Sequence, residues 1–92
     1  MNNWFELYAV GYSEDGVDTY VHTFVKKFNR ESKAREYIRS VEHFTDLFSE
    51  EFINENMNEV AYVELVLDKC RAIDAASNII DEESIVKILK KE

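Results

Sequence analysis

WFELYAVGYSEDGVDTYVHTFVKKF, residues 4–28, determines the fold expectation, because two runs of alternating side chains flank a short polar turn. The first run is typical of a half-buried strand over residues 3–12. The second, residues 17–28, is dense in β-branched and aromatic residues, which favour strands. Asp15-Gly16 supplies the positive φ that a short hairpin loop needs. The stretch therefore predicts a β-hairpin.

Alternation also assigns the side chains of this hairpin to two faces. In the first strand one face holds Phe5, Leu7 and Ala9, and the other holds Trp4, Glu6, Tyr8, Val10 and Tyr12. In the second strand one face holds Val17, Val21 and Val25, and the other holds Tyr20, His22, Phe24 and Phe28. We expect one face of the hairpin to pack against the rest of the chain.

Beyond the hairpin the apolar spacing changes to steps of three and four, which predicts an amphipathic helix. Its apolar positions are Ala34, Tyr37, Ile38, Val41, Phe44 and Phe48. Asn29 or Ser32 is expected to cap the first turn through its side-chain oxygen. The pattern continues to Phe52, with a break expected near Thr45 or Ser49.

Two further elements complete the chain. EVAYVELVLDKC, residues 59–70, alternates again and predicts a central strand with one strongly apolar face. DEESIVKILKKE, residues 81–92, favours a helix capped by Asp81, because acids fill its first turn and lysines its last. A fourth strand over SIVKIL, residues 84–89, is the alternative.

The chain is long enough for one compact domain. It has 92 residues, of which 46% are hydrophobic, with two glycines and no proline, so no linker or boundary is indicated. We predict a single α+β domain over residues 1–92 in the order β-β-α-β-α. Its helices should lie on one face of a small, mainly antiparallel sheet.

Catalytic and metal-binding patterns are not found in the sequence. His22, His43 and Cys70 are too few and too far apart for a zinc site, and no glycine-rich loop could cradle phosphate. We expect no cofactor, no metal and no enzymatic activity. His22 is expected to be half-buried, His43 solvated, and Cys70 a small core or edge hydrophobe. A tyrosine-lined small-molecule pocket around Tyr8, Tyr20 and Tyr62 is a less favoured hypothesis.

A single cysteine cannot form an internal disulfide, which fits a reducing compartment. The N-terminus has no signal-peptide pattern, and no apolar run approaches the length of a membrane span. We therefore expect a cytoplasmic protein that does not bind membranes.

Charge is distributed unevenly along the chain. The net charge is −8, yet residues 26–39 carry an excess of lysine and arginine. Residues 40–68 carry eight acids and no lysine or arginine. The basic stretch KKFNRESKAR, residues 26–35, could contact nucleic acid through its lysines and arginines, with Phe28 stacking on a base. Direct binding of nucleic acid is nevertheless disfavoured, because the overall negative charge would repel the phosphates.

The segment VEHFTDLFSEEFINENMNEV, residues 41–60, concentrates this negative charge. In a continuous helix Glu42, Asp46 and Glu50 would follow one another at four-residue steps, about 6 Å apart along the axis. Such a ridge serves either solubility or recognition of a basic partner protein, such as a groove that normally holds DNA or RNA. The predicted partner-binding residues are Glu42, Asp46, Glu50, Glu51, Glu55 and Glu59.

The order of WFELYAVGY, SEDG, VDTYVHTFVKKF, SKAREYIRSV and VAYVELVLD, with the acidic bias, resembles small phage-encoded accessory proteins. Anti-CRISPR inhibitors and other DNA mimics are among them. The resemblance implies an inhibitor that occupies a nucleic-acid-binding site of a host protein with carboxylates. The alternative is a self-associating scaffolding domain, a homodimer in which the basic stretch 26–39 of one copy meets the acidic stretch 40–68 of another.

Overall fold

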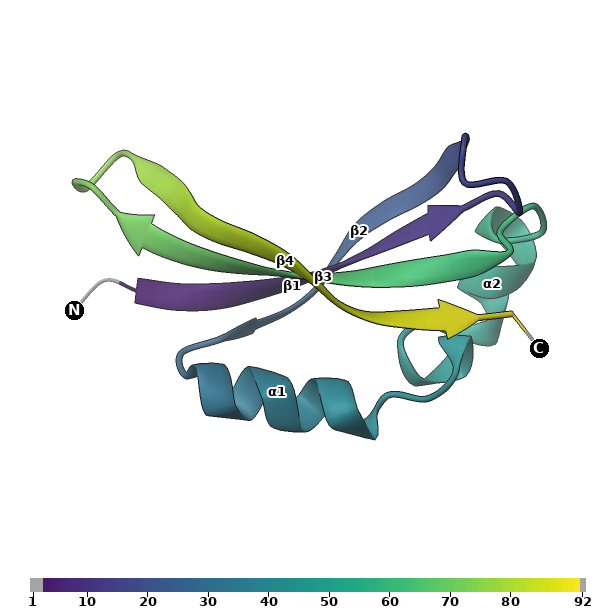
Figure 1. Ribbon diagram of the computed structural model, residues 1–92, viewed down its shortest axis with the longest axis horizontal. Helices are drawn as coiled ribbons and strands as arrows, with labels where there is room; N and C mark the ends of the chain where they lie inside the picture. Colours follow the sequence, from purple (N-terminus) through teal and green to yellow (C-terminus); the bar gives the residue numbers. More distant parts are fainter. Residues whose placement is uncertain (1–2, 92) are drawn as a thin grey trace.

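A computed structural model describes residues 3–91 and contains one four-stranded sheet (Figure 1). The elements are β1 (Asn3–Tyr12), β2 (Thr19–Phe28), α1 (Glu31–Ser40), the 3-10 helix η1 (Phe44–Asp46), α2 (Glu50–Asn56), β3 (Tyr62–Ala72) and β4 (Asn78–Lys90). All neighbouring strands are antiparallel, in the order β2-β1-β3-β4. The predicted α+β class is confirmed, with a fourth strand in place of the last helix.

The predicted hairpin is formed by β1 and β2. The first strand has its predicted bounds, and the second begins at Thr19. Gly16 has a φ of 76°, and its N–H donates to the carbonyl of Ser13 at 3.0 Å. The positive φ expected of the turn is therefore found at its glycine.

A β-bulge in β2 changes the face on which Phe28 lies. Leu7 is opposite Lys26 and Tyr8 is opposite Phe24, so Val25 is the extra residue. Beyond the bulge the alternation is reversed, and Phe28 is buried in the core. Its predicted placement beside His22 and Phe24 was wrong, because simple alternation cannot anticipate a bulge.

The single helix predicted to reach Phe52 is divided into three pieces. Helix α1 ends at Ser40, where the chain becomes extended, and this break lies earlier than predicted. Its N-cap is Arg30, without a side-chain capping bond, so the expected Asn29 or Ser32 cap is wrong. The expected break at Ser49 is confirmed: its hydroxyl accepts a hydrogen bond from the N–H of Phe52 at 3.1 Å and caps α2.

The C-terminal segment forms a strand, and the preferred helix was wrong. Strand β4 pairs along the whole of β3, which makes β3 central as predicted. Val86 is an extra residue between Ile85, opposite Val66, and Lys87, opposite Leu65. This bulge explains the misleading helical spacing, because it interrupts the two-residue period of a strand. Its many β-branched residues favour the strand alternative.

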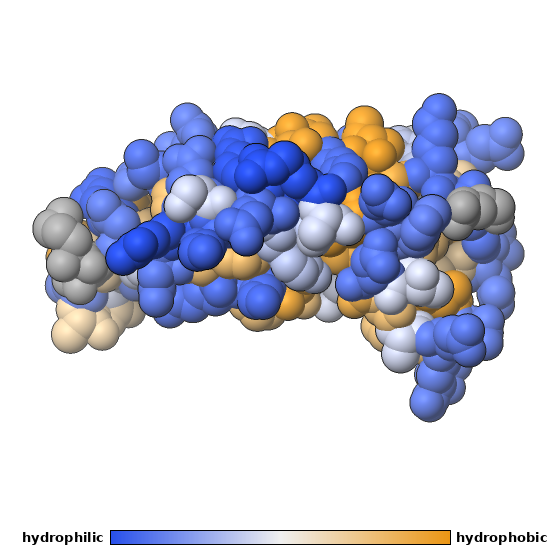
Figure 2. Space-filling view, turned by 90° about the horizontal axis from the view of Figure 1, so that it is seen from below, coloured by the Kyte–Doolittle hydropathy of each residue, from blue (hydrophilic) through white to orange (hydrophobic). Residues whose placement is uncertain are grey.

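The core lies between the sheet and the segment from α1 to β3. Its sheet residues are Leu7, Ala9, Val21, Phe28, Val63, Leu65, Leu67 and Leu89, and its other members are Ala34, Ile38, Val41, Phe44, Met57 and Val60. The side chains of the sheet residues in this core all project from the same face of the sheet, which we call the covered face. The outer surface on the side of α1 is mainly hydrophilic (Figure 2). None of the helices in residues 3–91 is long and apolar enough to span a membrane.

Lys87 connects the edge strand to α1 on the covered face. Its ammonium donates to the backbone carbonyl of Ile38 at 3.1 Å and to the carbonyl of Val41. Carbonyls at a helix C-terminus have no partner within the helix, and a cation there also suits the helix dipole. A strand side chain therefore completes the end of α1.

Candidate functional site

The opposite face of the sheet, here called the uncovered face, carries side chains in rows across the strands. One row holds Lys27, Glu6, Asp68 and Glu83, in the order β2-β1-β3-β4. The next row holds Phe24, Tyr8, Val66 and Ile85. On the other side of the first row, Trp4, Cys70 and Ile80 are aligned. The carboxylates of Glu6, Asp68 and Glu83, here called the acidic row, thus lie between two apolar rows.

Large apolar side chains are exposed on this face. Phe24, Ile80, Ile85 and Ile88 each expose at least half of their surface, between 51 and 60%. A single exposed isoleucine is ordinary, but several on neighbouring positions of one face form a patch. This clustering distinguishes the uncovered face from the hydrophilic outer surface of α1.

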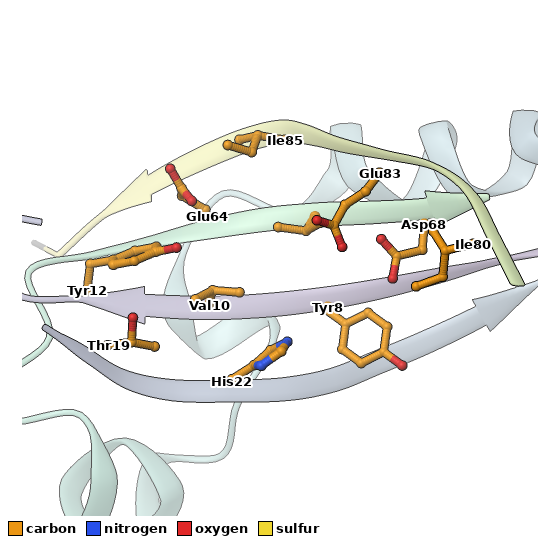
Figure 3. Close-up of a pocket in the computed structure, with 11 residues that line it drawn as sticks. Tyr8, Val10, Tyr12, Thr19, His22, Glu64, Asp68, Ile80, Glu83 and Ile85 are labelled. Atoms are coloured by element: carbon orange, nitrogen blue, oxygen red, sulfur yellow. The ribbon is translucent and has the colours of Figure 1, made fainter. Parts of the chain in front are cut away.

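A groove of about 670 Å³ runs over the uncovered face (Figure 3). It is lined by Tyr8, Val10, Tyr12, Thr19, His22, Glu64, Val66, Asp68, Ile80, Glu83 and Ile85. The close-up places Asp68 and Glu83 on neighbouring strands with their carboxyl groups directed into the groove. This volume and the mixture of apolar and polar lining are typical of ligand-binding sites.

Glu6 is held by two neighbours on its own strand. Its carboxylate accepts hydrogen bonds from Trp4 Nε1 and from the Tyr8 hydroxyl, both at 2.7 Å. The bond to Glu6 is the main cause that raises the pKa of Tyr8 to about 12. Lys27 Nζ lies 5.0 Å from the centre of the Trp4 ring, a cation–π contact. These contacts fix the β1 end of the acidic row.

Asp68 is the most unusual residue of the row. It is only 4% exposed, and its Oδ1 accepts no hydrogen bond from any residue between 3 and 91. Burial, a hydrogen bond with the Glu83 side chain and the charges of Glu83 and Glu6 raise the pKa of Asp68 to about 6. A hydrogen bond between two carboxyl groups requires a proton, so the pair binds a proton more strongly than an isolated acid.

The chemistry available here is that of a receptor for organic cations. Carboxylates in a partly apolar groove attract a positive group strongly, because water screens the charges less there. Residues 3–91 do not bring three or more histidine, cysteine or acidic side chains together in a way that could hold a metal ion. The carboxylates and the apolar lining of the groove suit an ammonium or guanidinium group with apolar neighbours.

The acids predicted to bind a partner lie outside this groove. Glu42, Asp46, Glu50, Glu51, Glu55 and Glu59 are all exposed. They do not form the expected helical ridge, because the chain is extended from 41 to 43 and η1 precedes α2. Asp46 instead accepts hydrogen bonds from the backbone N–H groups of Glu42 and His43, at 2.9 and 3.0 Å, which lower its pKa.

Other predicted residues are only partly brought together. Tyr8 and Tyr12 line the groove, and Tyr62 stacks on Tyr12 with ring centres 5.4 Å apart. Tyr20, expected with them, lies outside the groove. His22 lines the groove but is exposed, so its expected half-burial was wrong.

Cys70 is buried as expected. Burial is the main cause that raises the pKa of its thiol to about 11. At neutral pH this group is therefore a protonated, unreactive thiol.

The acidic row was missed by the sequence reasoning. Alternation correctly placed Glu6 beside Trp4 and Tyr8 and placed Asp68 beside Glu64 and Val66. Glu6 and Asp68 become neighbours through the pairing of β1 with β3, and the sequence does not reveal this pairing. Glu83 was hidden further by the mistaken helix.

Comparisons with models of protein families, with curated proteins and with solved structures found no match for this chain.

Proposed function

We propose that the chain is a non-enzymatic protein-interaction module that binds a basic segment or surface of another protein. The observation that supports this best is the uncovered face, where exposed isoleucines lie beside carboxylates. Protein interfaces combine apolar anchors with polar groups that set orientation. A basic partner would complement both the acidic row and the net charge of −8, which would speed its encounter with the chain.

The extent of the face favours a protein partner over a small molecule. Exposed apolar residues continue beyond the groove to Phe24 on one edge strand and Ile88 on the other. A small ligand would leave much of this patch in water, whereas a protein segment would cover it. Nucleic acid is disfavoured because its phosphates would be repelled by the acidic row.

Selection from a random peptide library against the immobilised chain tests the proposal. We expect selected peptides to be rich in basic and aliphatic residues, and Ile80→Ser to weaken their binding by about tenfold or more. Ile73→Ser is the matched control, because Ile73 is also 56% exposed but lies in the turn between β3 and β4. Equal binding by the two variants would show that the uncovered face is not the interface.

The acidic segment 42–59 is a second candidate surface. Glu50, Glu51 and Glu55 project from α2, and within residues 3–91 none of the six predicted acids is paired with lysine or arginine. This segment would bind a basic groove that normally holds nucleic acid, and the chain would then inhibit that protein. Glu50→Lys combined with Glu51→Lys would abolish such binding, whereas binding through the uncovered face would persist.

Self-association is the remaining alternative. Two basic residues of the 26–39 stretch already have partners within α1: Arg35 pairs with Glu31 at 3.2 Å and Lys33 with Glu36 at 3.7 Å. Less of the positive charge is therefore left for a second copy. Sedimentation at increasing salt decides the matter, since a dimer that dissociates with salt would favour this alternative and a monomer at high concentration would exclude it.

A further inference from the structure

A buried polar atom without a partner lies at the floor of the groove. Among residues 3–91, Asp68 Oδ1 is the only buried side-chain nitrogen or oxygen without a hydrogen-bond partner. Such groups are rare in folded proteins because an unsatisfied buried oxygen is costly. The oxygen belongs to a side chain that lines the groove. This combination indicates that the groove receives a hydrogen-bond donor from outside.

The surroundings of Asp68 define the charge of that donor. Glu6 and Glu83 lie opposite Asp68 on the two neighbouring strands. Lys27, at the end of the same row, directs its ammonium over the ring of Trp4. No lysine or arginine lines the groove within the described chain. A neutral donor would leave this concentration of negative charge uncompensated, whereas a cation would balance it.

We propose that Asp68 and Glu83 form a receptor for one arginine side chain of the partner protein, with the guanidinium bridging the two carboxylates. The inference rests on the proposed function and adds the identity of the anchoring residue. A guanidinium presents five donors in a plane and can bind two carboxylates at once. It is less strongly hydrated than an ammonium, so it suits a partly apolar site bordered by Tyr8, Ile80 and Ile85.

Below about pH 6, where Asp68 holds a proton, binding of arginine replaces that proton. The hydrogen bond between Asp68 and Glu83 requires one proton for the pair, and the guanidinium supplies both positive charge and donors in its place. The proton is then released to solvent, and the pKa of Asp68 falls. The other charged or titratable groups near Asp68 are Glu6 and Tyr8 on β1, His22 and Lys27 on β2, Cys70 on β3, and Glu83 on β4.

The two apolar rows beside the acidic row indicate which residues should flank the arginine in the partner segment. On β1 and β3 they lie two residues away from the acidic row, which is about 7 Å. On β4 Ile85 is two residues from Glu83, and Ile80 is three, because Asp81 is an extra residue there. An extended partner segment parallel to the strands would place aliphatic residues two positions before and after its arginine. A suitable probe is therefore the acetylated and amidated pentapeptide leucine-serine-arginine-serine-leucine.

The test is a titration of the isotope-labelled full chain with this probe, followed by NMR. We expect saturable shifts of groove amides and a fall in the pKa of Asp68 measured from its side-chain carbon. The same peptide with citrulline, which keeps the shape of arginine without its charge, should bind at least about tenfold more weakly. Lysine should give an intermediate affinity.

Variants of the chain separate the receptor from a general charge effect. Asp68→Asn and Glu83→Gln should each weaken binding of the arginine probe by about tenfold or more, and Glu51→Gln, which removes a charge outside the groove, should not. Equal affinity for arginine and citrulline, or unchanged binding by Asp68→Asn, would overturn the inference. If Ile80→Ser still weakened the binding of library peptides, the arginine receptor would be refuted and the proposed protein-interaction function would remain. If neither Ile80→Ser nor Asp68→Asn weakened binding, both proposals would be refuted.

Discussion

The covered and uncovered faces of the sheet are built from the same four strands but obey different constraints. On β3, Leu65 is fully buried on the covered face, while its neighbour Val66 is only partly buried on the uncovered face. The core residues of the covered face are all apolar, whereas the uncovered face accommodates a row of carboxylates across three strands. The comparison indicates that one face provides stability, whereas the other leaves large apolar side chains exposed.

The largest expected difference is in the free energy of unfolding, between variants in which Leu65 or its neighbour Val66 is replaced by alanine. Leu65→Ala should lower the free energy of unfolding by about 2–5 kcal/mol, because it leaves a cavity in the core. Val66→Ala removes less buried area and should cost about 1 kcal/mol or less. Urea denaturation of both variants measures the contrast. Similar losses would contradict it and would mean that the uncovered face is packed against another surface in solution.

Replacing Asp68 should have an effect of intermediate size on the free energy of unfolding, and this effect should depend on pH. Its folded pKa, about 6, lies above its unfolded value of about 4, so the folded chain holds this proton more tightly. The contribution of Asp68 to stability therefore decreases as pH rises from about 4 to about 6, by on the order of 2 kcal/mol. Asp68→Asn should be more stable than the parent at pH 7.5 and nearly equal to it at pH 4.

Denaturation at both pH values provides the measurement, and Asp81→Asn is a suitable control. Asp81 pairs with Arg71 at 3.1 Å, which lowers its pKa, so its removal should act in the opposite direction. An Asp68→Asn variant that is less stable than the parent at pH 7.5 would show that the buried carboxylate is not a source of instability.

The smallest of the three expected changes in stability comes from removing the hydrogen bonds that connect Lys87 on β4 to the end of α1. Lys87→Met keeps the aliphatic stem but removes the bonds to the carbonyls of Ile38 and Val41, and should cost about 1–2 kcal/mol. Lys90→Met, at the exposed end of the same strand, should change stability by less than about 0.5 kcal/mol. Thermal unfolding compares the two, and equal losses would remove any special role for Lys87.

The elements with a regular period were predictable, and the irregular ones were not. Residues 3–12 and the strand around Leu65 follow a two-residue period, which the structure preserves. Bulges at Val25 and Val86 interrupt that period, so simple alternation predicts the wrong face for Phe28, and the spacing in β4 predicts a helix. A bulge depends on the partner strand, and local sequence does not contain that information.

The candidate groove was less predictable than the fold for a related reason. Its residues come from four strands, and Glu6, Asp68 and Glu83 become neighbours only through the pairing of β1 with β3 and of β3 with β4. The prominent acids at 42–59 are contiguous in sequence and were noticed for that reason. Asp46 makes its hydrogen bonds to the nearby backbone of Glu42 and His43, whereas the acidic row is assembled by the pairing of strands that are distant in sequence.

The strand order has a consequence for the rate of folding. Each outer strand pairs with its sequence neighbour, so both hairpins can form within microseconds from local contacts. The central pairing must bring Tyr12 to Tyr62 and close the long segment between them, which is entropically slow. Asp68 and Glu6 belong to different hairpins and meet only at this step. During refolding, Glu6 should therefore join Asp68 and Glu83 only in the slowest phase, together with formation of the native state.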